Sequence, residues 1–404
     1  LVETPMIVDH VNESLRKINQ SAAYQDLPIT AHKVVPKTTE TFWVNLIGRG
    51  YPAPTQRFRW CTERMKINPA NSFILEKAAQ FGEVVMVLGA RKTESASRGQ
   101  VMANRRKVVG TQLRRHHSLA RAMVYTPIED FTTEDVWSYL LEVESPWGYD
   151  NRNLAALYRN ADSGECPLVV DTTTPSCGNS RFGCWTCTVV TRDKSMESMI
   201  DNGQEWMIPM LEFRDWLTET QDPEKKHIYR DYKRRNGRVT VVNEKVIPGP
   251  YRQNVRREIL RRLLQTQQLV REYGPDPDME LITEEELHEI RRIWRMEFPD
   301  WKDSVPLIYE EVTGRQLNWL QDDVGAFSAQ ELKLLNEVCA EYDDYPTELI
   351  ARLLEEERQM QGMHRRAGIF ERIEAVLRED WENEMAVSAQ YNWPGPATSE
   401  ADQA

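Results

Sequence analysis

Residues 84–89 read Val84-Val85-Met86-Val87-Leu88-Gly89. A short apolar run without a polar break is typical of a strand that is buried on both faces of a parallel sheet. A second strand candidate follows at Val124–Tyr125, and a third is predicted at residues 29–35. Helices are predicted after Thr4–Pro5 and over residues 133–140. Strands that alternate with helices in this way predict an α/β layered domain over residues 1–150.

The rest of the chain divides by composition. Residues 151–200 are rich in Cys, Gly, Thr and Pro and poor in regular patterns, which is typical of a functional loop. Residues 201–250 carry connecting helices and a predicted hairpin, and residues 251–393 are mainly helical, with capping boxes that mark two helix starts. Residues 394–404 are expected to form a disordered tail.

Composition and charge exclude several classes of protein. The 404 residues carry a formal net charge of −12, which argues against a protein covered in basic surface. No stretch approaches the roughly 18 apolar residues of a membrane span, and no signal peptide is recognisable, so a cytoplasmic protein without a membrane partner is predicted. Two arginine-rich stretches, residues 91–121 and 252–271, are candidate contacts for DNA phosphates, with solvated helix faces as the alternative.

Four cysteines lie close together in the Cys-rich segment, at Cys166, Cys177, Cys184 and Cys187. The final pair forms a CxxC motif, which places two thiolates on one ion or cluster, and the other two complete a tetrahedral set. Four unrelated buried cysteines are the alternative. The spacing does not choose between Zn²⁺ and a [4Fe–4S] cluster.

Cys61 stands apart from that group in the sequence. Arg57, Arg59, Arg64 and Lys66 surround it and are expected to lower the pKa of its thiol, which favours the nucleophilic thiolate. The alternative is a small buried residue beside Trp60.

The loop after the predicted central strand is a candidate phosphate site, because ligands of open α/β sheets bind beyond the carboxyl ends of the strands. Gly89 would permit close approach of the backbone, and Arg91, Lys92 and Arg98 would donate to phosphate. A solvated basic loop is the alternative. A Gly/Pro-rich turn at residues 48–54 could position Arg57 and Arg59 for the same ligand, or could be a plain connector.

Five stretches of the sequence together resemble the PAPS reductase-like branch of the ATP pyrophosphatases, and within it the DNA phosphorothioation proteins. They are residues 1–5, 42–54, 57–62, 89–98 and 179–187, the last being Asn179-Ser180-Arg181-Phe182-Gly183-Cys184-Trp185-Thr186-Cys187. The resemblance implies an adenosine nucleotide α-hydrolase-like parallel sheet with flanking helices, a Cys-rich insertion and a mainly helical C-terminal region. It also implies a [4Fe–4S] cluster held by Cys166, Cys177, Cys184 and Cys187.

The activity that the resemblance implies is sulfur insertion into DNA. ATP with Mg²⁺ would activate a backbone phosphate and release pyrophosphate, and sulfur would then replace a non-bridging oxygen. A cysteine desulfurase is the expected sulfur donor, Cys61 is the candidate sulfur carrier, and other proteins of a phosphorothioation complex are expected partners.

One departure from the family pattern is evident. The pyrophosphate-binding Ser-Gly-Gly-x-Asp-Ser loop is not found in the sequence, so residues 1–150 are expected to be a nucleotide-cleaving domain without its first strand and this loop, by truncation of the sequence or, alternatively, by loss of the loop. Two alternative functions stay open. One is a related enzyme of tRNA thiolation or sulfonucleotide reduction, and the other is a zinc-stabilised nucleic-acid-binding module.

Overall fold

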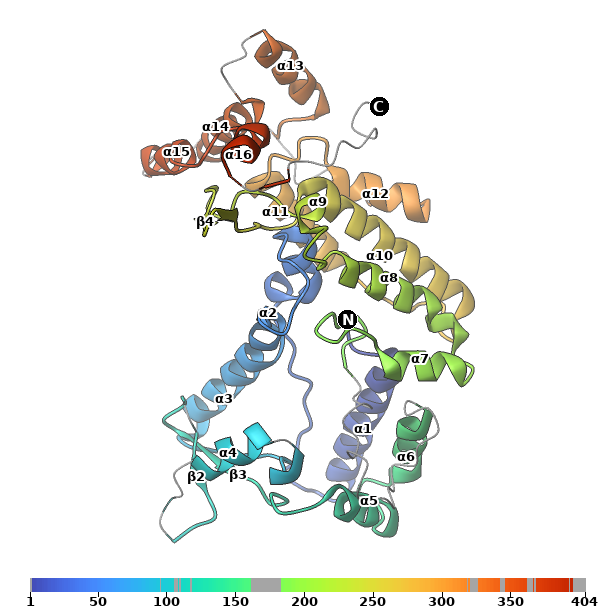
Figure 1. Ribbon diagram of the computed structural model, residues 1–404. Helices are drawn as coiled ribbons and strands as arrows, with labels where there is room; N and C mark the ends of the chain where they lie inside the picture. Colours follow the sequence, from blue (N-terminus) through green and yellow to red (C-terminus); the bar gives the residue numbers. More distant parts are fainter. Residues whose placement is uncertain are drawn as a thin grey trace. The chain divides into compact units, whose positions relative to one another are not determined.

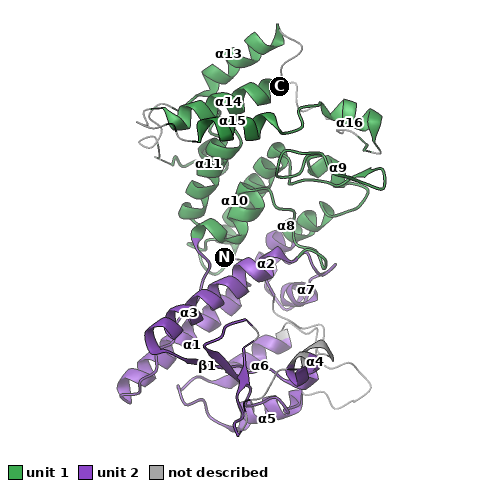
Figure 2. Cartoon of the chain, turned by 90° about the vertical axis from the view of Figure 1, so that its left-hand side faces the viewer, with its two compact units in different colours: residues 1, 38–58, 212–404 green, residues 2–37, 59–211 purple. Residues whose placement is uncertain are grey.

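The computed structural model describes residues 2–394 apart from residues 95, 105–107, 109, 117, 161–182, 318, 320–325, 342–345, 362–365, 367 and 392, and apart from the side chains of residues 96–98, 101 and 160. The chain forms two compact units (Figure 2). Unit 2 contains residues 2–37 and 59–211, and unit 1 contains residues 1, 38–58 and 212–404. The predicted boundaries at residues 150, 200 and 250 are therefore not the boundaries of the compact units.

Unit 2 consists mainly of helices around a small sheet (Figure 1). Its elements are α1 (Pro5–Tyr24), α2 (Trp60–Thr62), the π-helical turn η3 (Glu63–Ile67), α3 (Asn68–Phe81), β1 (Val84–Val87), the 3-10 turn η4 (Lys92–Glu94), α4 (Ala96–Asn104), β2 (Arg114–Arg115), β3 (Ala122–Tyr125), α5 (Thr133–Glu142), α6 (Asn151–Asn160), α7 (Lys194–Asp201) and the 3-10 turn η5 (Glu205–Met207). The predicted starts of α1 and α5 are confirmed.

The sheet has the strand order β1-β3-β2. Val84 pairs with Ala122 and Val87 with Tyr125 in parallel register, which confirms the predicted parallel pair, whereas β2 runs antiparallel to β3. The prediction that β1 is buried on both faces is wrong, because Val87 is 64% exposed. β1 is an edge strand, and its alternate side chains point away from the packed face.

Residues 29–35 do not form the predicted strand. They run as an irregular segment, and Ile29, Val34 and Val35 are all exposed. The β-branched residues predicted a strand from composition, but a strand needs a hydrogen-bonded neighbour, and the structure provides none for these residues. The α/β class is thus confirmed as a mixed, largely helical fold with a small sheet.

Unit 1 is helical except for one short hairpin. Its elements are the 3-10 turn η1 (Thr38–Glu40), the π-helical turn η2 (Val44–Gly48), α8 (Ile208–Glu219, mostly in this unit), α9 (Lys226–Tyr229), β4 (Val241–Val242), β5 (Lys245–Val246), α10 (Gln253–Tyr273), α11 (Glu284–Glu297), α12 (Ser304–Thr313), α13 (Ala329–Ala340), α14 (Thr347–Met360), α15 (Ile369–Leu377) and α16 (Glu384–Gln390). The capping boxes at Thr283–Glu286 and Ser328–Glu331 are confirmed.

The core of unit 1 forms around η2. Trp43 and Trp294 are fully buried, and their indole N–H groups donate to the carbonyl oxygens of Leu281 (2.7 Å) and Ile47 (3.0 Å). Because a buried indole N–H is costly without an acceptor, these two bonds fix residues 43–47 against α11.

The predicted hairpin is confirmed. β4 and β5 pair antiparallel, and the turn residues Asn243 and Glu244 both adopt left-handed backbone angles. This pair of angles is that of a type I′ turn, which matches the right-handed twist of the two strands.

The arginine-rich stretch at residues 252–271 lies on α10, and its guanidinium groups have partners within unit 1. Arg257 pairs with Asp300 (2.9 Å), Arg262 with Glu258 (2.6 Å), and Arg261 with Glu311 (3.0 Å). Ion pairs inside the unit therefore account for most of the charge pattern that predicted a DNA contact. Within the part of the chain that the structure describes, no helix has the length and apolar character to cross a membrane.

Candidate functional site

The candidate phosphate-binding loop continues directly from β1 in unit 2. Leu88 N donates to the Tyr125 carbonyl (2.8 Å), so the loop leaves the sheet beside the end of β3. Lys92 N then donates to the Glu129 carbonyl (2.9 Å), and Arg91 Nη1 donates to Thr133 Oγ1 (3.1 Å). The loop is therefore fixed on the turn that joins β3 to α5, at the carboxyl ends of the two parallel strands, as the sequence predicts.

Acidic side chains on that turn engage the basic groups of the loop. Lys92 pairs with Asp130 (2.7 Å) and with Glu129 (3.3 Å), and Arg91 lies 3.7 Å from Glu94. Lys92 and Arg91 are thus held in place but already bear carboxylate partners. A phosphate would have to compete with these carboxylates for the two cations.

The strongest electrostatic contact of the loop region is between Arg114 and Glu129. Both guanidinium nitrogens of the buried Arg114 donate to the Glu129 carboxylate, and Thr126 Oγ1 donates to it at 3.0 Å. The hydrogen bond from Arg114 is the main reason that the pKa of Glu129 is lowered to about 2. Glu129 therefore remains ionised at all physiological pH values and anchors β2, β3 and the loop together.

The Glu129 carboxylate predicts a specific response to acid. A carboxylate whose pKa is depressed in the folded state contributes stability above its unfolded pKa, and this contribution is lost as the pH falls toward the folded value. We expect the stability difference between the wild type and Glu129→Gln to be large at about pH 5 and to shrink toward about pH 2. Urea unfolding at several pH values measures this difference, with Glu76→Gln on the exposed face of α3 as control. A difference that does not change with pH contradicts this prediction.

As far as it describes them, the structure does not bring the other predicted phosphate ligands, Gly89, Arg57, Arg59 and Arg98, into one site. A Cβ atom at Gly89 would meet only Ile128 Cδ1, at 3.8 Å, so the packing of the chain itself does not require a glycine there. Arg57 and Arg59 are exposed, in unit 1 and unit 2 respectively. Among the described residues no hydrogen bond or ion pair joins Arg59 to the loop, and the side chain of Arg98 lies outside the described residues.

The CxxC pair lies in a turn that is held by the start of the chain. Glu3 forms an antiparallel bridge with Cys184, Trp185 N donates to the Val2 carbonyl (2.8 Å), and Thr4 Oγ1 donates to the Gly183 carbonyl (3.3 Å). Cys187 N donates to the Cys184 carbonyl (2.9 Å), which brings the two cysteines to the same side of a tight turn. The fully buried Trp185 between them anchors this turn.

Cys61 lies close to the CxxC pair, although the sequence separates them by more than a hundred positions. Burial raises the pKa of the Cys184 thiol to about 11, and Lys66 opposes this rise, whereas Cys187 and Cys61 add to it. The pKa of Cys61 is raised as well, first by burial and then also by Cys187. The predicted lowering of the Cys61 pKa by neighbouring arginines is therefore wrong. Desolvation of the half-buried thiol outweighs the exposed cations, whose charges are screened by water.

The described part of the predicted metal site has a chemistry that fits sulfur ligation. Cys184 and Cys187 lie at the two ends of one tight turn, and a CxxC turn is of the kind that directs two sulfurs at one centre. Cys166 and Cys177 lie outside the described residues. The residues that the structure does describe contain no complete group of three metal ligands.

Sequence reasoning missed the residues that hold the loop in place. Arg114, Thr126 and Glu129 form the buried hydrogen-bonded ion pair behind the loop. Lys66, which the sequence associates with Cys61, acts on Cys184 instead. The signal for Glu129 was available, because acidic and hydroxyl residues directly after a parallel strand lie at the ligand-binding edge of a sheet. The proximity of Cys61 to Cys187 had no local signal.

Two known families match parts of this chain. Residues 24–190 match the phosphoadenosine phosphosulfate reductase domain, and this range includes the loop after β1, Cys61 and the CxxC pair. Residues 330–378 match a family described as a small protein found in certain Dnd DNA modification systems. Residues 24–190 are therefore similar to a PAPS reductase domain. Together the two matches support a DndC-like relationship to the PAPS reductase family.

A relative from Methanocaldococcus jannaschii, described as an uncharacterized protein, is 28% identical over 115 residues. The match covers 28% of this chain and 21% of the relative, so this chain accounts for only about a fifth of that protein's length. No solved structure matches this chain.

Proposed function

We propose that this protein is a sulfurtransferase of DNA phosphorothioate modification. In this function ATP activates a phosphate of the DNA backbone with release of pyrophosphate, and sulfur replaces one non-bridging oxygen. The phosphoadenosine phosphosulfate reductase domain supports the nucleotide chemistry, and the Dnd-type match supports DNA as the substrate.

The observation that carries the proposal is the proximity of three thiols within the matched domain. The Cys187 thiol raises the pKa of Cys61, and Cys187 and Cys61 both raise the pKa of Cys184, whereas Lys66 lowers the pKa of Cys184, all within unit 2. A sulfur carrier has to lie near the groups that load and discharge it, and three half-buried thiols, with Lys66 acting on Cys184, provide such a place. A purely structural cysteine would not need these neighbours.

The proposed reaction proceeds in balanced steps. A non-bridging oxygen of the DNA phosphate attacks the α-phosphorus of ATP, and pyrophosphate leaves. A persulfide on Cys61, loaded by a cysteine desulfurase, then attacks the activated DNA phosphorus through its terminal sulfur, and AMP leaves with the displaced oxygen. Two equivalents of a thiol reductant finally cleave the sulfur–sulfur bond and are themselves oxidised to a disulfide, which releases the DNA phosphorothioate and restores the Cys61 thiol.

The cofactors and partners belong to the same proposal. Cys166, Cys177, Cys184 and Cys187 would hold a [4Fe–4S] cluster, which supplies redox-active iron when bound. Mg²⁺ would accompany ATP, and Arg91, Lys92 and Arg98 would contribute to binding of its phosphates. Besides the DNA and the desulfurase, other phosphorothioation proteins are expected partners, in the cytoplasm.

The cluster assignment predicts the metal content of a single variant. We expect Cys187→Ser to lose bound iron and acid-labile sulfide to background, because a four-thiolate site rarely keeps its cluster with three. Anaerobic purification followed by iron, zinc and sulfide analysis measures this loss. Cys339→Ser is the matched control, because Cys339 lies on α13 in unit 1.

The same measurement separates the alternatives. About one zinc ion per chain without sulfide favours the zinc-stabilised nucleic-acid-binding module, and contradicts the cluster assignment. If the wild type contains iron and sulfide but leaves cellular DNA without phosphorothioate, the related enzymes are favoured. Thiolated tRNA in the same cells would then favour tRNA thiolation over sulfonucleotide reduction.

A further inference from the structure

Unit 1 contains a cavity of about 690 Å³ outside the segment that matches the reductase domain. Its lining includes residues 231–237, the N-terminal turn of α10, the end of α11 with residues 298–299, and the facing side of α14. All of the lining residues belong to unit 1, so the cavity is formed within one compact body. The charged groups on its wall determine what it can hold.

Arg256 is the most unusual of these groups. Its side chain is only 2% exposed, and it forms no ion pair with any described carboxylate. Nε donates to the Tyr251 carbonyl (2.7 Å), Nη1 donates to the Gly48 carbonyl (3.3 Å), and the guanidinium lies 4.0 Å from the centre of the Phe298 ring. Neutral oxygens and an aromatic face orient this cation without neutralising it.

The backbone is built to admit Arg256. Gly50 has a left-handed φ of +68°, and a Cβ atom there would come within 2.4 Å of Arg256 Nε. Only glycine leaves room for the guanidinium at this point. A buried cation without a carboxylate partner is expensive, so its retention in a shaped space indicates an anionic partner from outside the chain.

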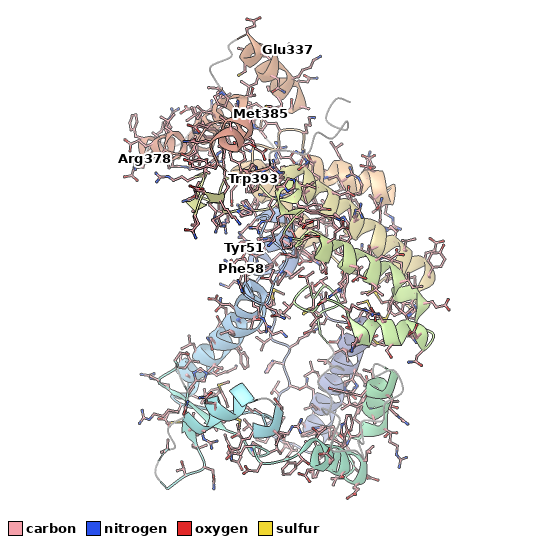
Figure 3. All side chains as sticks on the ribbon, viewed as in Figure 1. Tyr51, Phe58, Glu337, Arg378, Met385 and Trp393 are labelled. Atoms are coloured by element: carbon pink, nitrogen blue, oxygen red, sulfur yellow. The ribbon has the colours of Figure 1, made fainter. Side chains whose placement is uncertain are left out.

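Further donors share the cavity wall. Lys233, Arg234 and Arg235 also form no ion pair with a described carboxylate. Arg235 donates to the Tyr51 hydroxyl and lies 4.8 Å from the centre of the Tyr51 ring. Tyr51 stacks on Phe58, and these two residues are labelled in Figure 3. The contact with the Tyr51 ring limits the conformations of the Arg235 guanidinium in the absence of a ligand, which lowers the entropic cost of binding.

The N-terminus of α10 adds two features that favour an anion. No side chain caps this 21-residue helix, and its first residue, Gln253, lines the cavity. Both polar atoms of the Gln253 amide are buried without a hydrogen-bond partner. Such an amide is costly unless a ligand or water completes its bonds, and the helix end favours negative charge beside it.

The acidic groups on the wall do not cancel this arrangement. Glu355, Glu356 and Glu379 pair with Arg358, Arg372 and Arg352 respectively. Asp231, Glu297 and Glu348 remain, against the four cations without ion pairs. Burial lowers the pKa of Arg256 to about 9 and outweighs the opposing charges of Asp231 and Glu297, neither of which forms an ion pair with it.

We propose that this cavity binds a phosphate group through Arg256, Arg235 and the Gln253 amide. Planar guanidinium groups and a neutral amide donor match the oxygens of a phosphate, either in a nucleic-acid backbone or in a free phosphate compound. This site is separate from the thiols of unit 2 and does not depend on the sulfurtransferase proposal.

The test measures binding of defined probes to the full chain. Isothermal titration with inorganic phosphate and pyrophosphate tests the free source, and fluorescence anisotropy with labelled single-stranded and duplex oligonucleotides tests the backbone source. We expect Arg235→Gln and Gln253→Leu to weaken binding of at least one probe, the former by about 10- to 100-fold. Arg238→Gln, on the same exposed segment but outside the cavity, should leave binding unchanged.

The outcomes separate the two sources. Loss of phosphate or pyrophosphate binding in the variants supports a free ligand, and loss of oligonucleotide binding alone supports a nucleic-acid backbone. Arg256→Gln, compared by thermal unfolding with the wild type, should give the largest loss if it folds. The proposal is overturned if no probe binds the wild type, or if Arg238→Gln weakens binding as much as Arg235→Gln does.

Discussion

Cys61→Ser is expected to abolish sulfur incorporation into DNA while the iron content of the protein stays at the wild-type level. Serine has nearly the same volume as cysteine but cannot carry a persulfide, so the variant removes the proposed carrier without opening a cavity. We expect phosphorothioate linkages in cellular DNA to fall at least about 100-fold, because a missing nucleophile is rarely replaced by a neighbour. Nuclease digestion followed by mass spectrometry of phosphorothioate dinucleotides measures this content.

The comparison of Cys61→Ser with two other variants gives the prediction its discriminating power. Cys187→Ser should lose both iron and DNA sulfur, and Cys339→Ser should lose neither. A Cys61→Ser protein that modifies DNA at the parental level would end the carrier role. Loss of iron together with DNA sulfur in that variant would instead make Cys61 a ligand of the metal site, which the proximity of Cys187 makes chemically reasonable.

Parts of the fold could be predicted from local sequence patterns. Thr4–Pro5, the Asn243-Glu244 turn and the capping box at Thr283–Glu286 each specify their structure within a few residues, and all three are confirmed. The irregular path of residues 29–35 and the exposed face of β1 were not predictable in this way. Both depend on which segments lie beside a strand, and composition does not encode that.

In the candidate site, too, local motifs could be predicted from the sequence, whereas burial and the proximity of distant segments could not. The CxxC motif and the loop after β1 are local, and the structure places the loop where the strand pattern predicts it. The pKa of Cys61 was predicted with the wrong sign, because neighbouring charges are visible in a sequence and burial is not. The electrostatic coupling between Cys61 and the CxxC pair joins segments far apart in sequence, and so does the cavity around Arg256.

Gly249→Ala is expected to cause the largest loss of stability of any single methyl addition in unit 1. A Cβ atom at Gly249 would lie 1.6 Å from the Lys233 carbonyl oxygen and 2.7 Å from its carbonyl carbon. These are backbone atoms, so no side-chain rotation relieves the clash. Gly249 N also donates to the Asp231 carbonyl (2.6 Å), and its own carbonyl accepts from Arg230 Nε (2.7 Å). The two chain segments would have to separate and break both bonds.

We therefore expect Gly249→Ala to lower the free energy of unfolding by about 3 kcal/mol, at the upper end of overpacking costs. Urea unfolding followed by tryptophan fluorescence measures this loss, and two transitions are allowed for because the chain has two compact units. Gly89→Ala is the matched control, since its Cβ would meet only Ile128 at 3.8 Å and should cost well under about 1 kcal/mol. Equal effects of the two substitutions would show that the close approach of residues 233 and 249 does not hold in solution.

Lys233 lines the cavity of Arg256. If Gly249→Ala pushes the segments around Lys233 and Gly249 apart, the substitution should therefore also weaken phosphate binding in that cavity.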